Sequence, residues 1–158
     1  MFGVVDKLFA PRGPLFNVAG IRLTKDETTE LIQTCNVLAR FLNIQIEAIQ
    51  SLSSLPDFQA GRVIIWIQTR QIDINTHLSA IIFRTKSSAC PWINEFSDAR
   101  TALDGKVRTI NKFSAVNGWV PGARVYWSCM IETYEWLLPL TLRLREKSEE
   151  ALQEQEQQ

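Results

Sequence analysis

The chain has 158 residues, of which 46% are hydrophobic and 22% are charged, and its formal net charge at pH 7 is zero. This length and composition are typical of one soluble globular domain with a core of its own. No apolar run approaches the ~20 residues that a membrane-spanning helix needs, and Asp6 and Lys7 interrupt the apolar start, which is unlike a signal peptide. We therefore expect a cytoplasmic protein without a transmembrane segment.

The first 23 residues predict an N-terminal arm. Residues 1–9 have apolar side chains at helical spacing, which is typical of a short amphipathic segment that packs on its own domain, on a membrane surface or on a partner helix. Pro11 and Pro14 then interrupt any helix, because proline lacks a backbone N–H. The following PLFNVAGIRL is expected to be an extended arm or a short strand.

A long helix is predicted from Thr24 to about residue 52. Thr24 and Glu27 form a T-x-x-E capping box, in which each side chain satisfies a free backbone N–H of the other residue. Apolar residues then recur every three or four positions, with Gln45 as the only polar residue in this register: Leu31, Cys35, Leu38, Leu42, Ile49 and Leu52. This apolar surface is wide, which indicates a bundle interior or an interface.

Residues 58–86 allow two interpretations. One apolar face holds its helical register across the whole segment, which favours a single long helix. However, RVIIWIQT and LSAIIFRT are rich in β-branched and aromatic residues, and DINTH between them has the composition of a turn. The alternative is therefore an α+β fold with a hairpin formed by residues 62–69 and 78–85.

Two further helices complete the prediction. Residues 96–113 carry a single apolar stripe, and residues 123–144 form a heavily apolar and aromatic segment in which Pro139 should kink or divide the helix. Residues 146–158 form an acidic, Glu- and Gln-rich tail, predicted as a solvated helix or a frayed end. The expected fold is mainly α, a single-domain bundle of about four helices in which residues 24–145 form the helical domain.

His77 is the only histidine, and Arg70 precedes it by seven residues. This spacing resembles the Arg–His pair of helical ribonucleases of the HEPN type, in which four to six residues separate the two. The resemblance implies action on an RNA backbone at a dimer seam, with Arg70 and His77 as catalytic candidates. A histidine can move protons near neutral pH, and an arginine can hold a phosphate through two hydrogen bonds. The alternative is a helix face on which Arg70 pairs with Asp73 and His77 lies at the edge of the core.

The zero net charge hides an uneven distribution. Residues 146–158 sum to −4 (five Glu against one Lys), whereas residues 60–124 sum to +5 (nine Arg and Lys against four Asp and Glu). A basic stretch beside an acidic tail indicates an anionic partner such as nucleic acid, although an ordinary mixed-charge surface is the alternative. The candidates for phosphate binding are Arg62, Arg84, Lys86, Arg100, Lys106, Arg108 and Lys112.

Aromatic residues gather in the last predicted turn and helix. Tryptophan and tyrosine are enriched at protein interfaces, because their rings bury a large area while a polar edge stays satisfied. A plain core, a ligand pocket and base stacking beside the basic residues are the alternatives. The interface candidates are Trp119, Tyr126, Trp127, Tyr134 and Trp136.

Motifs of the common enzyme classes are absent from the sequence. It has no glycine loop for phosphates or dinucleotides, no marked nucleophile and no paired metal-ligand spacing, so we expect no cofactor and no metal. The separated Cys35, Cys90 and Cys129 are expected to be buried free thiols.

We therefore interpret the chain as a non-enzymatic assembly or adaptor subunit of a homo-oligomer or of a larger complex. The apolar surfaces on residues 27–52 and 123–144 are its expected contacts. A nucleic-acid-associated small subunit, ribonucleoprotein or nucleocapsid-like, using residues 62–124, is the second hypothesis. A helical ribonuclease using Arg70 and His77 is the third.

Overall fold

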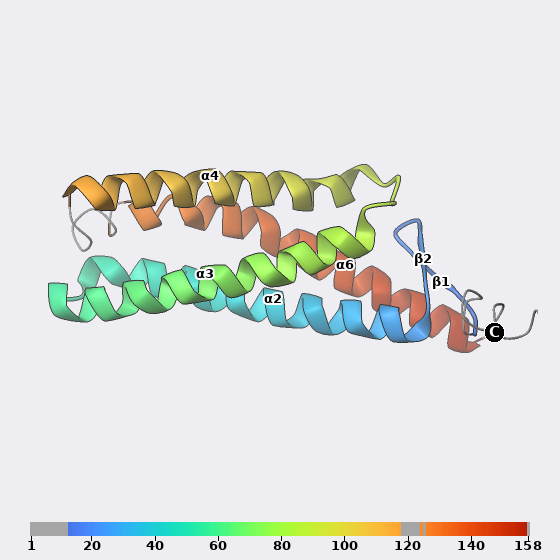
Figure 1. Cartoon of the computed structure of the whole chain (residues 1–158). Helices are drawn as coiled ribbons and strands as arrows, with labels where there is room; N and C mark the ends of the chain where they lie inside the picture. The colour runs from blue at the N-terminus through green and yellow to red at the C-terminus, as the bar shows by residue number, and fades with distance from the viewer. Residues whose placement is uncertain (1–12, 118–123, 125, 158) are drawn as a thin grey trace, which may run out of the picture.

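The structure, a computed structural model, describes residues 13–117, 124 and 126–157. The described part of the chain contains four long helices that run alternately up and down the molecule (Figure 1): α2 (Lys25–Ser51), α3 (Asp57–Thr85), α4 (Asn94–Asn117) and α6 (Met130–Gln157). Each helix packs on two neighbours, in the order α2, α3, α4, α6 and back to α2. The predicted mainly α bundle is thus confirmed.

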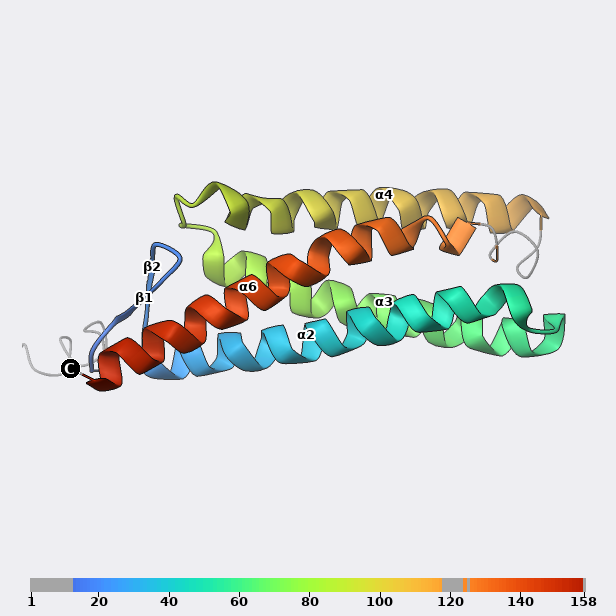
Figure 2. The same ribbon diagram turned by 180° about the vertical axis from the view of Figure 1, so that it is seen from behind.

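The four seams between neighbouring helices differ in extent. α2 packs most extensively on α6, whereas α3 and α4 make the sparsest seam. Figure 2 shows α6 crossing the bundle diagonally, from the side of α4 to the side of α2.

α2 begins at the predicted capping box. The backbone N–H of Glu27 donates to Thr24 Oγ1 at 3.1 Å, and the backbone N–H of Thr24 donates to Glu27 Oε1 at 2.9 Å. The Glu27 carboxylate also binds the Arg84 guanidinium at 2.5 Å, which ties the start of α2 to the end of α3. The hydrogen bond from the Thr24 backbone is the main cause that lowers the pKa of Glu27 below its ordinary value, and Arg84 adds to it.

We expect Glu27→Gln to lower the free energy of unfolding at pH 7 by about 1 kcal/mol, the usual size of a cap contribution. The pKa of Glu27 is lower in the folded chain than in the unfolded chain, so the stabilisation is present above the unfolded value of 4.5 and is lost as the pH falls. Urea titrations at a series of pH values should therefore show the two proteins converging in acid. Glu30→Gln is the control, because Glu30 is exposed and lies 3.5 Å from Arg84. A difference that persists at low pH would contradict the assignment.

Residues 62–85 lie within the single helix α3, so the alternative hairpin at 62–69 and 78–85 is wrong. Burial of one continuous helical face in the bundle outweighs the strand preference of the β-branched residues. A hairpin does exist in the N-terminal arm, where β1 (Phe16–Val18) pairs with β2 (Ile21–Leu23) in antiparallel register. Residues 1–12, and with them the predicted amphipathic start, lie outside the described residues.

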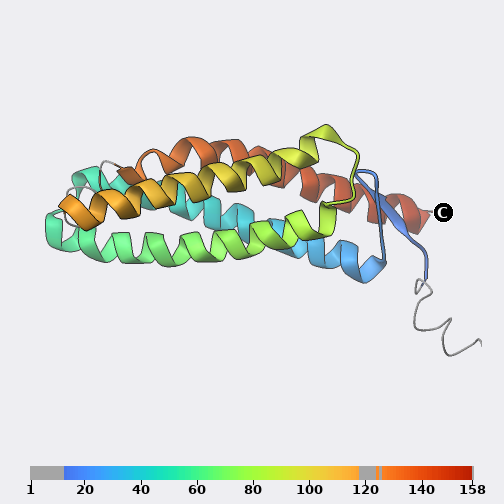
Figure 3. The ribbon, with the colours of Figure 1, turned by 45° about the horizontal axis from the view of Figure 1, so that its top comes forward.

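The hairpin closes one end of the bundle (Figure 3). Its inward side chains are buried and its outward ones are exposed, and β1 packs on α6. Ala19 and Gly20 form the turn with φ of 50° and 84°, and Asn17 Oδ1 accepts from the Gly20 N–H at 3.0 Å. Ser88 Oγ donates to the Ala19 carbonyl at 2.6 Å, which fixes the hairpin to the α3–α4 connection.

The last predicted element is divided, but not at Pro139. A turn at Ser128 and Cys129 separates the helical residues before it from α6, which then continues through Pro139. Pro139 is exposed, so the carbonyl that loses its helical partner can be hydrated. α6 also continues into the acidic tail, where Ser148 and Ala151 are buried.

Candidate functional site

The most unusual surface of the molecule is the side of α3 opposite its buried face. Four large apolar residues there expose more than half of their surface: Phe58 at 71%, Ile65 at 60%, Ile72 at 67% and Phe83 at 64%. They recur with four small or polar residues at alternating steps of three and four, and these eight residues are named the α3 stripe: Phe58, Arg62, Ile65, Thr69, Ile72, Thr76, Ser79 and Phe83. Trp66, 67% exposed, flanks the stripe.

The cations near the α3 stripe lie at its ends. Arg62 stacks over the Phe58 ring at 4.6 Å, and Lys86 stacks over the Phe83 ring at 4.7 Å. The central part, from Ile65 to Thr76, carries no charge within the stripe. Figure 3 shows α3 along an outer edge of the bundle. The four large apolar residues of the stripe are all exposed.

The apolar surfaces that the sequence predicts as contacts, on residues 27–52 and 123–144, are mostly buried inside the bundle. On α2, the predicted stripe is buried in the core, and so are the large side chains of α6 such as Met130 and Leu137. The width of the α2 stripe therefore serves two neighbours, α3 and α6, within the same chain. Only single residues of these segments, such as Ile44 and Leu142, expose as much as 37% of their surface.

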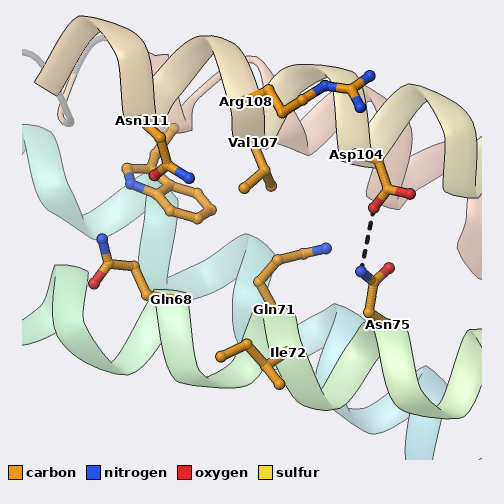
Figure 4. Close-up of a pocket in the computed structure, with 9 residues that line it drawn as sticks. Gln68, Gln71, Ile72, Asn75, Asp104, Val107, Arg108 and Asn111 are labelled. Atoms are coloured by element: carbon orange, nitrogen blue, oxygen red, sulfur yellow. Dashed lines mark hydrogen bonds between the residues drawn. The ribbon is translucent and has the colours of Figure 1, made fainter. Parts of the chain in front are cut away.

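A pocket opens at the sparse seam between α3 and α4. Its volume is about 470 Å³. Its walls consist of four amide side chains, two charged ones, two aliphatic ones and one tryptophan: Gln68, Gln71, Asn75, Asn111, Asp104, Arg108, Ile72, Val107 and Trp127. Figure 4 shows Gln68 and Asn111 on opposite walls near one end. At the other end Asn75 Nδ2 donates to Asp104 Oδ1 at 3.2 Å.

Arg70 and His77 lie on one side of α3, two turns apart, and both are partly buried. The His77 ring packs edge-on against Phe41 of α2 at 5.6 Å, and its Nδ1 lies 2.8 Å from the Asp73 carbonyl oxygen. Among these described side chains, the Asp73 carboxylate makes no hydrogen bond or ion pair with the imidazole or with Arg70. The geometry therefore places His77 at the edge of the α2–α3 seam and adds no support for Arg70 and His77 as a catalytic pair.

The basic candidates are spread over α3 and α4. Arg84 pairs with Glu27 and Glu30, and Arg100 lies 3.9 Å from Asp104. Lys106 Nζ donates to the Cys129 carbonyl at 2.9 Å and to Thr133 Oγ1 at 2.7 Å, which joins α4 to the start of α6. Arg62 and Lys86 lie at opposite ends of α3, Arg108 lines the pocket, and Lys112 is exposed near the end of α4. The structure does not gather these seven side chains into one patch.

The aromatic candidates divide into core and surface. Trp127 is 2% exposed and Tyr134 is fully buried, so both side chains are used inside the bundle. Trp136 is 37% exposed and its Nε1 donates to Glu95 at 3.1 Å, while Tyr126 is partly buried and its ring lies 4.2 Å from that of Phe113. Trp119 lies outside the described residues.

Of the three cysteines only Cys35 is buried, because Cys90 is partly exposed and Cys129 is exposed. Burial raises the pKa of the Cys35 thiol to about 12, so this thiol stays protonated at neutral pH. All three are free thiols. Within the described ranges, no group of three or more His, Cys, Asp and Glu side chains is arranged to hold a metal ion.

A scan with protein-family models finds no match to this chain, and comparisons with curated proteins and with solved structures find no significant relative either. Among the described residues, no helix has the length and apolar character needed to cross a membrane. The function must therefore be argued from the α3 stripe and from the α3–α4 pocket.

Proposed function

We propose that this chain is a non-enzymatic assembly subunit that pairs with a second copy of itself through the α3 stripe. The observation that carries the proposal is the row of large apolar side chains left exposed along one face of α3. Several large exposed apolar residues that recur along one face of a helix are typical of protein contacts.

The spacing of the α3 stripe suits a helix partner. Steps of three and four residues are those of the contact positions in paired helices, where side chains of one helix fit between those of the other. The stripe covers 25 helical steps from Phe58 to Phe83, which at ~1.5 Å per residue gives a contact about 38 Å long.

The α3 stripe is also complementary to itself in an antiparallel pair. With a two-fold axis between Arg70 and Gln71, Ile65 of one copy faces Thr76 of the other, and Ile72 faces Thr69. Large residues thus meet small ones at the centre of the contact. At its ends Phe58 faces Phe83, and Arg62 faces Ser79. A symmetric dimer requires such a self-complementary surface, in which each contact occurs twice.

The size of the contact is sufficient for a modest dimer. Covering the exposed apolar residues of both stripes, with Trp66 beside them, removes about 1,000 Å² from water, which is the lower end of specific interfaces. We therefore expect a dimer that dissociates on dilution.

The free thiols fit a reducing compartment, which supports a cytoplasmic location as part of this proposal.

The test is the oligomeric state of Ile65→Glu, measured by light scattering and by sedimentation over a dilution series. We expect the wild-type chain to be a dimer, and the variant to dissociate about 100-fold more readily, because two carboxylates become buried without partners. Val116→Glu is the matched control, since Val116 on α4 is 83% exposed and lies outside the stripe.

A charge swap tests the antiparallel register. Adding Thr76→Lys to Ile65→Glu should restore pairing, because the introduced ammonium of one copy would then face the introduced carboxylate of the other, on both sides of the axis. Residues 65 and 76 of one copy are about 16 Å apart along α3, so they cannot compensate each other within one chain. A monomeric wild-type chain, or a dimer that ignores Ile65→Glu, would overturn the proposal. A complex that forms only with single-stranded RNA and weakens with salt would instead favour the nucleic-acid hypothesis.

A further inference from the structure

The α3–α4 pocket contains buried polar atoms whose hydrogen-bonding capacity the chain leaves unused. Gln71 is 5% exposed and Trp127 is 2% exposed, and both line the pocket. Among the described residues neither Gln71 Nε2 nor Trp127 Nε1 has an acceptor. A buried N–H without a partner costs about 1–3 kcal/mol, so such groups call for an explanation.

A chain of hydrogen bonds that starts at the Ile67 backbone carbonyl determines which end of the Gln71 side-chain amide is the oxygen and which is the nitrogen. Gln45 Nε2 donates to the Ile67 carbonyl at 2.8 Å, which sets the orientation of the Gln45 amide, and it also donates to the Tyr134 hydroxyl oxygen at 3.3 Å. Since Tyr134 accepts there, its O–H donates to Gln71 Oε1.

Gln71 Nε2 is therefore a donor that faces away from this chain of hydrogen bonds. Figure 4 shows the Gln71 amide pointing into the space between α3 and α4. Neither N–H bond of this amide has an acceptor among the described residues, and the nitrogen is buried in the pocket wall.

The pocket is lined by one carboxylate, Asp104, and one guanidinium, Arg108, of which only Asp104 has a partner among the described residues. The Asp104 carboxylate accepts from Asn75 and lies near Arg100, whereas no described carboxylate pairs with Arg108. The buried donors outnumber the one unused buried acceptor of the walls, Asn75 Oδ1. A complementary molecule is therefore rich in acceptor oxygens and carries negative charge.

We propose that the α3–α4 pocket binds a small organic anion, a carboxylate or phosphate on a compact apolar body. Its acceptor oxygens take up the N–H groups of Gln71 and Trp127, and Arg108 balances its charge. Ile72 and Val107 supply the apolar wall. The volume of about 470 Å³ lies in the range of small-molecule sites. A monomeric chain would keep the same pocket, and Ile72 is the one lining residue that the pocket shares with the α3 stripe.

The experiment uses three probes that share one ring: benzoate, phenyl phosphate and the neutral benzamide. Each is titrated into the isotope-labelled full chain while the side-chain N–H signals of Gln71 and Trp127 are followed by NMR. We expect saturable shifts of both signals with at least one of the two anions, at concentrations up to about 10 mM, and weaker or no shifts with benzamide. Whichever anion binds more tightly identifies the source as a carboxylate or a phosphate.

Arg108→Met should weaken the binding of the anion about tenfold. The matched control is Lys112→Met, which removes a cation one helical turn further along α4 and outside the pocket lining, and should leave the affinity unchanged. Both residues are exposed, so neither change threatens the fold.

Gln71→Glu offers a second variant, because it keeps the acceptor for Tyr134 but removes both donors and should abolish binding. If no probe moves the two signals, the N–H groups are served by ordered water only and the proposal fails. Equal binding of benzamide and benzoate, or equal loss in Lys112→Met, would overturn the anion assignment.

Discussion

Replacing Trp127 by alanine is expected to lower the free energy of unfolding by about 3–5 kcal/mol, the largest effect of any single change considered for this chain. The Trp127 side chain is 2% exposed and is the largest of the fully packed residues. Its removal loses the transfer energy of the indole and leaves a cavity beside the α3–α4 pocket that rigid helices cannot close. Urea unfolding followed by circular dichroism measures the loss.

Trp66→Ala is the matched control, because Trp66 is the same residue type but is 67% exposed on α3. Both variants are best measured in the Ile65→Glu background, so that self-association does not contribute to the apparent stability. The control should change the free energy of unfolding by less than about 0.5 kcal/mol. If Trp127→Ala costs no more than Trp66→Ala, then Trp127 is not part of the core.

Tyr134→Phe should lower the free energy of unfolding by about 1–3 kcal/mol, although it removes a single oxygen atom. The lost hydroxyl is the donor to Gln71 Oε1, and no water replaces it easily in a fully buried place. The Gln71 carbonyl oxygen is then buried without a partner. Thr141→Val is the control, because Thr141 is also fully buried but its hydroxyl bonds only the Leu137 carbonyl of its own helix, at 2.8 Å.

A double-mutant cycle with Gln71→Leu separates this cause from a loss of packing. Leucine at position 71 needs no donor, so Tyr134→Phe should cost much less in that background than in the wild-type chain. The two free-energy changes would simply add if Tyr134 stabilised the bundle through its ring alone.

The helices of this fold are predictable from the sequence because each is specified by local rules. The Thr24–Glu27 capping box, and the apolar register that follows it on α2, involve residues within a few turns of each other. The same holds for α3, whose helical register continues across the segment that also resembles two strands.

Which face of a helix is covered depends on neighbours that the sequence does not specify. α3 has apolar residues on two opposite faces, and the structure buries the face that contains Ile67 and Ile74 while it leaves the face that contains Ile65 exposed. The sequence interpretation therefore does not include the α3 stripe and expects the excess apolar surface on residues 27–52 and 123–144 instead. The signal available in advance was the run of large apolar residues seven apart at Phe58, Ile65 and Ile72.

The α3–α4 pocket could not be predicted from the sequence, but one residue of the hydrogen-bonded chain beside it is recognisable there. Gln45 is the one polar residue in the register of α2, and it is fully buried. A polar residue in such a position implies a partner, yet its partners come from α3 and α6, 22 and 89 residues away in sequence. Only the folded arrangement of the helices identifies them.

The chain of hydrogen bonds from the Ile67 carbonyl through Gln45 and Tyr134 to Gln71 also limits how the helices can slide. Leucine and isoleucine side chains pack almost as well after a shift of one turn, so an entirely aliphatic interior would allow several alignments of α2, α3 and α6 of similar energy. A shift of any one of these three helices by about 5.4 Å would separate the donors from their acceptors inside hydrocarbon. These four polar groups thus select one axial alignment of α2, α3 and α6. The same alignment fixes the position of the α3 stripe relative to the rest of the bundle.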